Sequence, residues 1–97
     1  MFARVASFEG GDVERLRQMS EERMASGTMN LPEGVKRTLV LADGERNRRL
    51  FVTFFESREQ VDAAEQRFDA MGDEVPEDVR GRRTSVDVYE VVFDEQA

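Results

Sequence analysis

The order in which the hydrophobic pattern changes is the feature that most constrains the fold of this chain. Alternation of apolar and polar residues, which is typical of strands, gives way twice to the spacing of an amphipathic helix. Along the 97 residues the order is strand, helix, strand, strand, helix, strand. There is no internal repeat and no linker, so the pattern predicts a single α+β domain over residues 1–97.

Local signals predict where these elements begin and end. Strands are predicted over Phe2–Phe8, Val35–Ala42, Arg48–Glu56 and Thr84–Phe93, helices over Val13–Ser26 and Ser57–Gly72, and a loop over residues 28–34. Asp12 is predicted to cap the first helix, and Gly27 to occupy the left-handed position after its last turn. Ser57 and Gln60 form a capping box at the start of the second helix, which Gly72 is expected to end.

This element order is the ferredoxin-like arrangement, in which right-handed crossovers place both helices on one face of a four-stranded antiparallel sheet. The face without helices would be polar if it met water. In the third predicted strand, however, Phe51 and Phe55 lie on one face and Leu50, Val52 and Phe54 on the other, so both faces are apolar. A symmetric homodimer that places sheet against sheet would bury this surplus, at about 1.5–3 kcal/mol per large side chain. We therefore expect self-association through the free sheet face, as a dimeric α/β barrel. A monomer with an imperfectly polar sheet is the alternative.

The residue types that are missing narrow the chemistry. The chain has no histidine, cysteine or tryptophan, which leaves no imidazole base, no disulfide and no metal bound by histidine or thiolate. No metal-ligand spacing or phosphate-binding loop is present, and we expect no metal and no cofactor. The net charge of −7 disfavours nucleic acid and anionic membranes as partners, and no apolar run is long enough to span a bilayer. A cytoplasmic protein is the prediction.

Four segments carry a resemblance to a known group of proteins. They are Met1-Phe-Ala-Arg-Val, Leu39-Val-Leu-Ala-Asp, Val52-Thr-Phe-Phe-Glu-Ser and Val86-Asp-Val-Tyr-Glu-Val. With the element order, they resemble the dimeric α/β-barrel superfamily, and within it the antibiotic-biosynthesis-monooxygenase-like domains, many of them uncharacterised bacterial proteins. The resemblance covers nearly the whole chain and implies a homodimer with a ligand cavity in each protomer. The superfamily includes cofactor-independent monooxygenases, isomerases, proteins without known activity, and haem-degrading enzymes, whose iron-binding histidine is missing here.

The first predicted helix carries polar residues on its apolar side. Ser20 and Arg23 share that side with Val13, Leu16 and Met24. Buried polar groups cost free energy unless they find partners. Ser20 and Arg23 are therefore candidates to face a polar or anionic ligand in a cavity between this helix and the sheet. Alternatively, Arg23 extends over apolar surface and its charge favours the C-terminal end of the helix dipole.

Four residues with charged or hydroxyl groups lie inside predicted strands. Arg4 and Arg37 occur in the first and second strands, and Asp87 and Tyr89 share one face of the last strand. As a site, Tyr89 would donate a hydrogen bond or a proton to a ligand carbonyl while an arginine stabilises an oxyanion. Cross-strand ion pairs at the dimer seam or an exposed edge, worth about 0.2–1 kcal/mol, are the simpler interpretation.

Two arginine clusters and one polar segment remain. Arg46, Arg48 and Arg49 surround the predicted hairpin tip, and Arg80, Arg82 and Arg83 precede the last strand. Either cluster could grip a phosphate or carboxylate, but beside 21 acidic residues a solvated surface with scattered ion pairs is favoured. The segment Asp73–Arg83, in which Pro76 can start a short helical turn, is either a lid over a cavity or a plain connection.

Two functions fit these features. The first is a small-molecule site in which a cofactor-independent, monooxygenase-like enzyme oxidises an apolar or aromatic metabolite. The second is a non-catalytic homodimer that binds a metabolite or serves as a structural module, which the missing histidine, cysteine and tryptophan favour. The sequence identifies no catalytic residue. The ligand-binding candidates are Ser20, Arg23, Arg4, Arg37, Asp87 and Tyr89.

Overall fold

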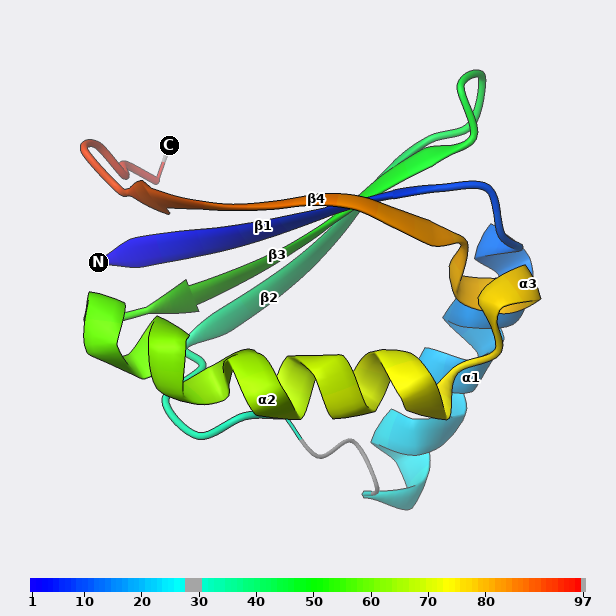
Figure 1. The fold of residues 1–97 in the computed structure, drawn as a ribbon, viewed down its shortest axis with the longest axis horizontal. Coiled ribbons are helices and arrows are strands. Elements are labelled where there is room, and N and C mark those ends of the chain that lie inside the picture. Colours follow the sequence, from blue (N-terminus) through cyan, green and yellow to red (C-terminus); the bar gives the residue numbers. More distant parts are fainter. Residues whose placement is uncertain (28–30, 97) are drawn as a thin grey trace.

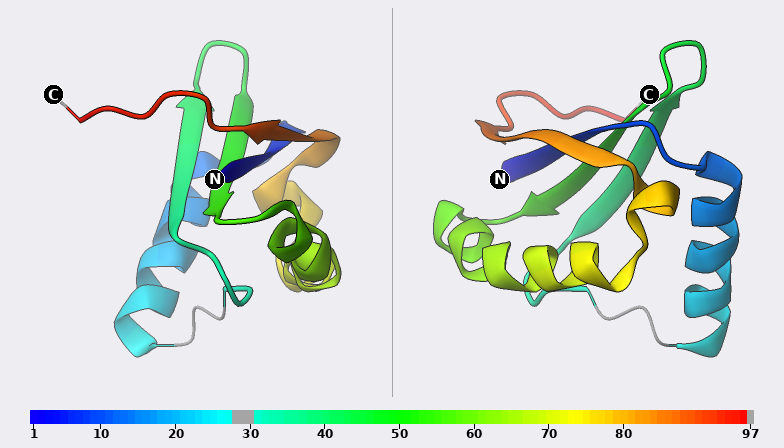
Figure 2. Two further views of the ribbon diagram at one scale, coloured as in Figure 1. Left: turned by 90° about the vertical axis from the view of Figure 1, so that its left-hand side faces the viewer. Right: turned by 45° about the vertical axis from the view of Figure 1, so that its right-hand side comes forward.

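The computed structural model describes residues 1–27 and 31–96, apart from the side chain of Asp73, so the predicted loop over residues 28–34 lies partly outside the described residues. The elements in chain order are β1 (Phe2–Glu9), α1 (Val13–Ser26), β2 (Arg37–Asp43), β3 (Arg48–Phe55), α2 (Arg58–Glu74), α3 (Glu77–Arg80) and β4 (Arg82–Glu90). The strands form one antiparallel sheet in the order β2-β3-β1-β4 (Figure 1). Both long helices lie on the same side of this sheet (Figure 2), which confirms the predicted ferredoxin-like α+β class.

The predicted helix caps are present. The Asp12 carboxylate accepts a hydrogen bond from a backbone N–H of the first turn of α1 at 3.1 Å, and Gly27 follows the helix with φ +72°. At the start of α2 the Ser57 hydroxyl accepts a hydrogen bond from the N–H of Gln60 at 3.2 Å. The side-chain oxygen of Gln60 accepts one from the N–H of Glu56 at 3.1 Å, one residue before the position that the capping box predicts.

The second helix passes through Gly72, so the prediction that this glycine ends it was wrong. α2 continues to Glu74 and stops at Val75, whose backbone is extended with φ −110° and ψ 126°. Val75 precedes Pro76, and the proline ring disfavours the helical conformation for the residue before it. Proline, and not glycine, therefore ends α2, and Pro76 then begins the short helix α3 as predicted.

The last strand ends earlier than predicted. β4 stops at Glu90 because Glu90 pairs with Phe2, the first residue of β1. Beyond it the Val91 N–H donates to the Met1 carbonyl at 2.9 Å, and β1 then has no backbone left with which to pair. The predicted extension to Phe93 was wrong for this reason, and the C-terminal segment leaves the sheet (Figure 1).

The starts of β2 and β4 each differ from the prediction by two residues. β2 begins at Arg37 and not at Val35, because the Val35 N–H bonds back to the Pro32 carbonyl in a turn, at 3.5 Å. β4 begins at Arg82, earlier than predicted, because Arg82 pairs with Glu9 at the far end of β1.

The position of α2 decides which sheet face is buried. Phe51 and Phe55 of β3 meet Phe68 of α2, whose ring lies edge-on to theirs with centroid distances of 6.3 and 6.2 Å. Val61 and Ala64 of α2 complete this buried cluster. The main core is therefore built by α2 and β3, with Phe2 of β1 and Val88 of β4 packed against it.

The opposite face of the sheet is only partly covered. Leu41, Leu50 and Tyr89, which lie on it, are 49%, 37% and 56% exposed. Val92 and Phe93, beyond β4, are almost fully exposed. These side chains are the apolar surplus that the two-faced strands predict. Within residues 1–27 and 31–96, no helix is long and apolar enough to cross a membrane.

Helix α1 is set apart at one end of the sheet (Figures 1 and 2) and contacts α3. None of its side chains, all of which the structure describes, is fully buried. Val13 and Leu16, which the helical pattern placed on its inner side, are only half-buried, and Met24 is exposed. The apolar side of α1 thus faces a space and does not pack directly against the sheet.

Candidate ligand-binding site

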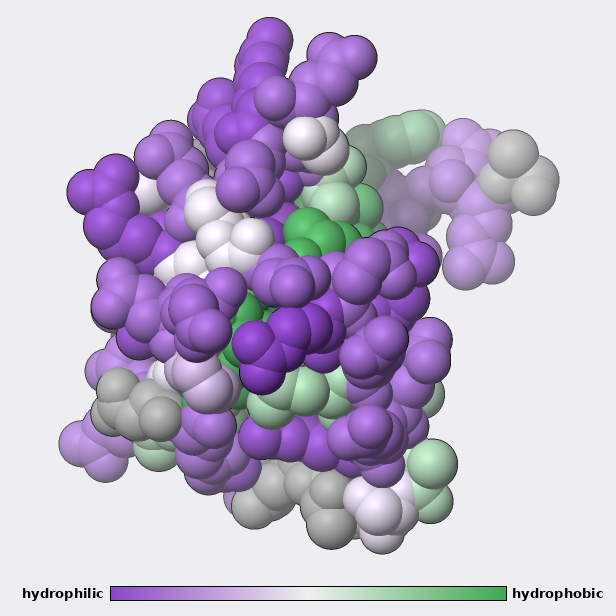
Figure 3. Space-filling model, turned by 90° about the vertical axis from the view of Figure 1, so that its right-hand side faces the viewer, coloured by the Kyte–Doolittle hydropathy of each residue, from purple (hydrophilic) through white to green (hydrophobic). Residues whose placement is uncertain are grey.

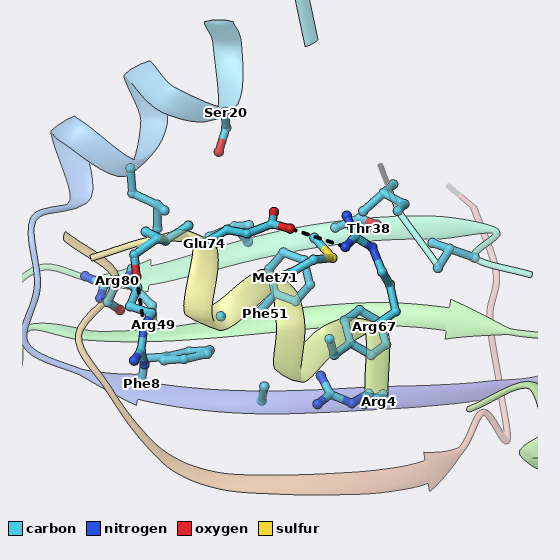
Figure 4. Close-up of a pocket in the computed structure, with 18 of the residues that line it drawn as sticks. Arg4, Phe8, Ser20, Thr38, Arg49, Phe51, Arg67, Met71, Glu74 and Arg80 are labelled. Atoms are coloured by element: carbon cyan, nitrogen blue, oxygen red, sulfur yellow. Dashed lines mark hydrogen bonds and ion pairs between the residues drawn. The ribbon is translucent and has the colours of Figure 1, made fainter. Parts of the chain in front are cut away.

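A cavity of about 1100 Å³ lies between α1, α2 and the helix-facing side of the sheet (Figure 4). Phe8 and Phe51 contribute apolar walls from the sheet, Leu16 and Met19 from α1, and Met71 from α2. On the outside, the end of the molecule that carries α1 is largely hydrophilic, and hydrophobic residues are visible mainly in hollows between polar ones (Figure 3). The molecule therefore has an apolar space, open to solvent, between polar surface residues.

Positive charge dominates the polar part of the lining. Cationic side chains come from Arg4, Arg23, Lys36, Arg37, Arg49, Arg67, Arg80 and Arg83. Among the described residues, only Asp69 and Glu74 add carboxylates. The chain as a whole carries a net charge of −7, so the fold concentrates cations in one place. A concave site lined by one sign of charge raises the local concentration of ligands with the opposite sign.

Arg4 lies on the floor of the cavity and is paired. It is 2% exposed, and its Nε and Nη2 donate to the two carboxylate oxygens of Glu65, on α2, at 2.7 and 3.2 Å. Its guanidinium also lies 4.1 Å from the centroid of the Phe68 ring. The two-pronged ion pair neutralises a charge that would otherwise be costly to bury. The sequence favoured an exposed or cross-strand partner for this arginine, whereas the partner comes from the helix above it.

Further ion pairs join residues of the cavity lining. Glu74, at the end of α2, lies 3.3 Å from Arg67 on the same helix and 4.0 Å from Arg23 on α1. Asp69 lies 3.1 Å from Arg83, at the start of β4. Arg23 therefore connects α1 to α2 across the cavity, and both carboxylates of the lining are occupied by arginines.

Arg49 is the least expected residue of the lining. It is 3% exposed at the start of β3, its Nη2 donates to the Arg80 carbonyl, and its Nη1 is buried without a hydrogen-bond partner among the described residues. Burial lowers the pKa of the guanidinium, and the nearby charge of Asp12 opposes this effect. A solvated position, which the sequence favoured, is wrong for Arg49. Its strand parity placed it on the same sheet face as Phe51, but the sequence left open which face meets the helices.

A second buried polar atom lines the cavity without a partner. The hydroxyl of Thr38, on β2, makes no hydrogen bond to any part of the chain that the structure describes. Thr38 and Arg49 lie toward opposite ends of the cavity (Figure 4). A hydroxyl both donates and accepts hydrogen bonds, so this end could satisfy a second polar group of a ligand. The described residues contain no cluster of three or more acidic side chains that could hold a metal ion.

Four of the six predicted ligand-binding residues line the cavity: Arg4, Ser20, Arg23 and Arg37. Ser20 points from α1 toward the cavity (Figure 4). Arg37, at the start of β2, is exposed and pairs with Phe54, and its guanidinium lies 6.0 Å from the centroid of that ring. Its charge is therefore directed to the free sheet face, although the residue borders the cavity. The lining thus joins residues from helix and sheet that lie far apart in the chain.

Asp87 and Tyr89 are not brought together with Arg4, Ser20 and Arg23. Val88, between them on β4, packs against the core cluster on the helix-facing side. Because side chains alternate along a strand, Asp87 and Tyr89 lie on the other sheet face. The structure therefore separates the predicted tyrosine from Arg4 and Arg23, the predicted arginines whose charges face the helix side.

Comparisons with known proteins bear on the fold. No protein-family model matches the sequence, and no curated protein matches it. Among solved structures, the crystal structure of a MhuD mutant, described as having two manganese protoporphyrin IX bound per active site, matches with a TM-score of 0.59 and 16% sequence identity, over 100% of both chains. The resemblance inferred from strand pattern and element order is thereby confirmed at the level of the fold. This chain has the ferredoxin-like fold that MhuD also has.

Proposed function

We propose that the protein binds a small, mainly apolar molecule that carries an anionic group, in the cavity between α1, α2 and the sheet. The observation that carries this proposal is the lining, which combines apolar walls with a cluster of cations in a chain of net charge −7. Ligand pockets commonly measure about 300–1,000 Å³. At about 1100 Å³ this cavity has room for a metabolite, and the position of α1 leaves it unfilled by protein.

Aromatic and polyketide-like acids meet this description, and so does a porphyrin. MhuD is described with manganese protoporphyrin IX in its active site, and a porphyrin of this kind combines an apolar plane with carboxylates. This chain has no histidine to ligate iron. Porphyrin binding would therefore rest on contacts between its carboxylates and the arginines of the cavity, and metal-free protoporphyrin IX is a suitable test ligand.

Binding without turnover has the better support. A cofactor-independent monooxygenase needs a group that exchanges a proton with its substrate. Asp69 and Glu74, the carboxylates that line the cavity, are held in ion pairs with arginines. Tyr89, the one tyrosine of the chain, lies on the other sheet face. We therefore propose a metabolite-binding module in preference to a monooxygenase-like enzyme.

Blocking the cavity is expected to abolish ligand binding. Ser20→Trp places a large side chain in the space below α1, whereas Gln18→Trp places the same side chain on the exposed side of that helix. Calorimetry with metal-free protoporphyrin IX and a panel of aromatic acids should show affinity at least about tenfold lower for Ser20→Trp than for Gln18→Trp. Equal binding by both variants would place the ligand elsewhere.

The same panel tests turnover. Oxygen uptake with quinol-type substrates is expected to stay at the background rate for the unmodified protein. Sustained uptake that Arg23→Ala abolishes and Tyr89→Phe preserves would establish the enzyme instead, since only Arg23 lines the cavity.

We also propose that the protein is a homodimer through the free sheet face. The exposed Leu41, Leu50 and Tyr89 on that face support this proposal, as do Val92 and Phe93 beyond β4. Large apolar patches on a small domain commonly mark an interaction site. A two-fold pairing would cover the same patch on both copies.

A charge on this face is expected to prevent association. Leu41→Glu introduces a carboxylate among the apolar side chains, whereas Ala70→Glu adds the same charge on the exposed side of α2. In sedimentation equilibrium at tens of micromolar, the unmodified protein and Ala70→Glu should show twice the 11.1 kDa chain mass, and Leu41→Glu the chain mass alone. An unmodified protein that sediments as a monomer would contradict the dimer.

A further inference from the structure

We propose that Arg49 and Arg80 form the anion-binding end of the cavity and hold the carboxylate of the ligand, with its apolar body lying toward Phe51 and α1. This assignment rests on the proposed function and adds to it the chemical group that is recognised and the residues that recognise it. Figure 4 shows Arg49 and Arg80 close together at one end of the cavity, with Arg4 and Arg67 toward the other.

Most cations of the lining are already neutralised. Arg4 is paired with Glu65, Lys36 lies 3.4 Å from Glu56, and Arg83 lies 3.1 Å from Asp69. Arg23 and Arg67 share Glu74. A ligand anion would have to displace a protein carboxylate to reach any of these groups. Arg37 lies over the ring of Phe54, on the free sheet face.

Arg49 and Arg80 differ from those residues. Neither makes an ion pair with any residue that the structure describes; the Arg49 Nη2 donates to the Arg80 carbonyl, and the Arg80 Nε and Nη1 donate to the carbonyls of Val75 and Gly81 at 3.2 and 3.3 Å. Carbonyl oxygens satisfy hydrogen bonds but carry no net charge. The charge of Asp12 acts on Arg49, but the two make no ion pair. Two like charges therefore meet at the same end of the cavity, and an anion between them would compensate both.

Two glycines, Gly11 and Gly81, leave space for the guanidinium of Arg49. Gly11 and Gly81 both have positive φ, +84° and +81°, and a Cβ built on either would lie 2.5 and 2.7 Å from the Arg49 Nη2. The missing side chains of these two glycines thus leave the room that the guanidinium occupies. Its buried Nη1 has no partner among the described residues, and a buried donor without a partner is uncommon in native proteins. A ligand oxygen would satisfy it.

A carboxylate fits this end better than a larger anion. It is planar and presents two oxygens, which match the parallel N–H groups of a guanidinium. Phe8 lies beside Arg49 in the lining (Figure 4), so the ligand becomes apolar immediately beyond its charged group. An aromatic or aliphatic monocarboxylic acid is the ligand class that follows.

The test compares acids with their neutral amides. Calorimetry is run with decanoate and decanamide, and with 2-naphthoate and 2-naphthamide, on the unmodified protein and on Arg49→Gln, Arg80→Gln and Arg48→Gln. Arg48 is the neighbour of Arg49, is exposed and lies outside the cavity, so it serves as the matched control. The unmodified protein and Arg48→Gln should prefer the acid by about tenfold or more. Arg49→Gln and Arg80→Gln should lose most of this preference while their affinity for the amide is unchanged.

The outcomes separate the two proposals. If the unmodified protein binds neither acids nor amides, the proposed function fails. If it binds both and the preference for the acid survives in Arg49→Gln and Arg80→Gln, the function stands and the anion site is wrong. If circular dichroism shows that Arg49→Gln does not fold, Arg80→Gln alone tests the anion site, because Arg80 is only half-buried. Tighter binding of decyl phosphate than of decanoate would overturn the assignment to a carboxylate.

Discussion

Replacing Phe55 by alanine is expected to lower the free energy of unfolding by about 3–5 kcal/mol, the usual cost of truncating a buried aromatic residue. Phe55 is 0% exposed, and its ring meets that of Phe68 between β3 and α2. The total stability of a small domain is only about 5–15 kcal/mol, so this single change removes a large share of it. Urea unfolding followed by circular dichroism measures the loss.

The neighbouring phenylalanine provides the control. Phe54 lies on the opposite sheet face and is only half-buried in one chain. In the Leu41→Glu background, where the dimer is expected to be absent, Phe54→Ala should cost less than half as much as Phe55→Ala. Phe55→Leu, which keeps most of the buried volume, should also cost much less than Phe55→Ala. Equal losses for Phe54→Ala and Phe55→Ala would mean that α2 does not decide which face is buried.

Replacing Gly81 by alanine is expected to destabilise the protein by about 3 kcal/mol or more. Gly81 has φ +81° and ψ −176°, a backbone conformation open essentially to glycine alone. A Cβ at this position would lie 2.6 Å from the Glu9 carbonyl oxygen and 2.7 Å from that of Gly10. Backbone atoms cannot move aside cheaply, so the contact between β1 and the start of β4 would open. Thermal and urea unfolding measure the change.

Gly10 offers a matched comparison. Its φ is also positive, +78°, but a Cβ there would meet no described atom within 4 Å. Gly10→Ala should therefore cost only the backbone strain, roughly 1–2 kcal/mol. If both variants lost the same stability, strain alone, and not the close approach of β1 to Gly81, would be the cause.

The features of this fold that depend on neighbouring residues, such as the helix caps, could be predicted from the sequence. The caps at Asp12, Gly27 and Ser57 are present because each depends on a side chain or backbone conformation within a few residues. The wrong strand boundaries are those that depend on pairing with a strand far away in the sequence. The apolar residues that predicted the last strand continue to Phe93, but β4 stops where β1 has no residue left to pair with it.

The residues of the candidate site could be predicted from the sequence only in part. The polar residues on the apolar side of the first helix, Ser20 and Arg23, pointed to a cavity, and both line it. Arg49 was missed because its cluster at the hairpin tip suggested solvent. Whether an arginine at the end of a strand is exposed or buried depends on what covers that face, and α3 and the turn after β1 cover it here.

The sequence by itself determined the order of elements, their caps and the presence of apolar side chains on both sheet faces. Those properties follow from contacts between near neighbours in the chain, which periodicity records directly. Only the tertiary structure decided that α2 packs on the face of Phe51 and Phe55 while α1 stands apart and leaves a cavity. The local sequence pattern does not distinguish between two sheet faces that are both apolar. The choice between them, and with it the burial of Arg4 and Arg49, is made by packing between segments far apart in the chain.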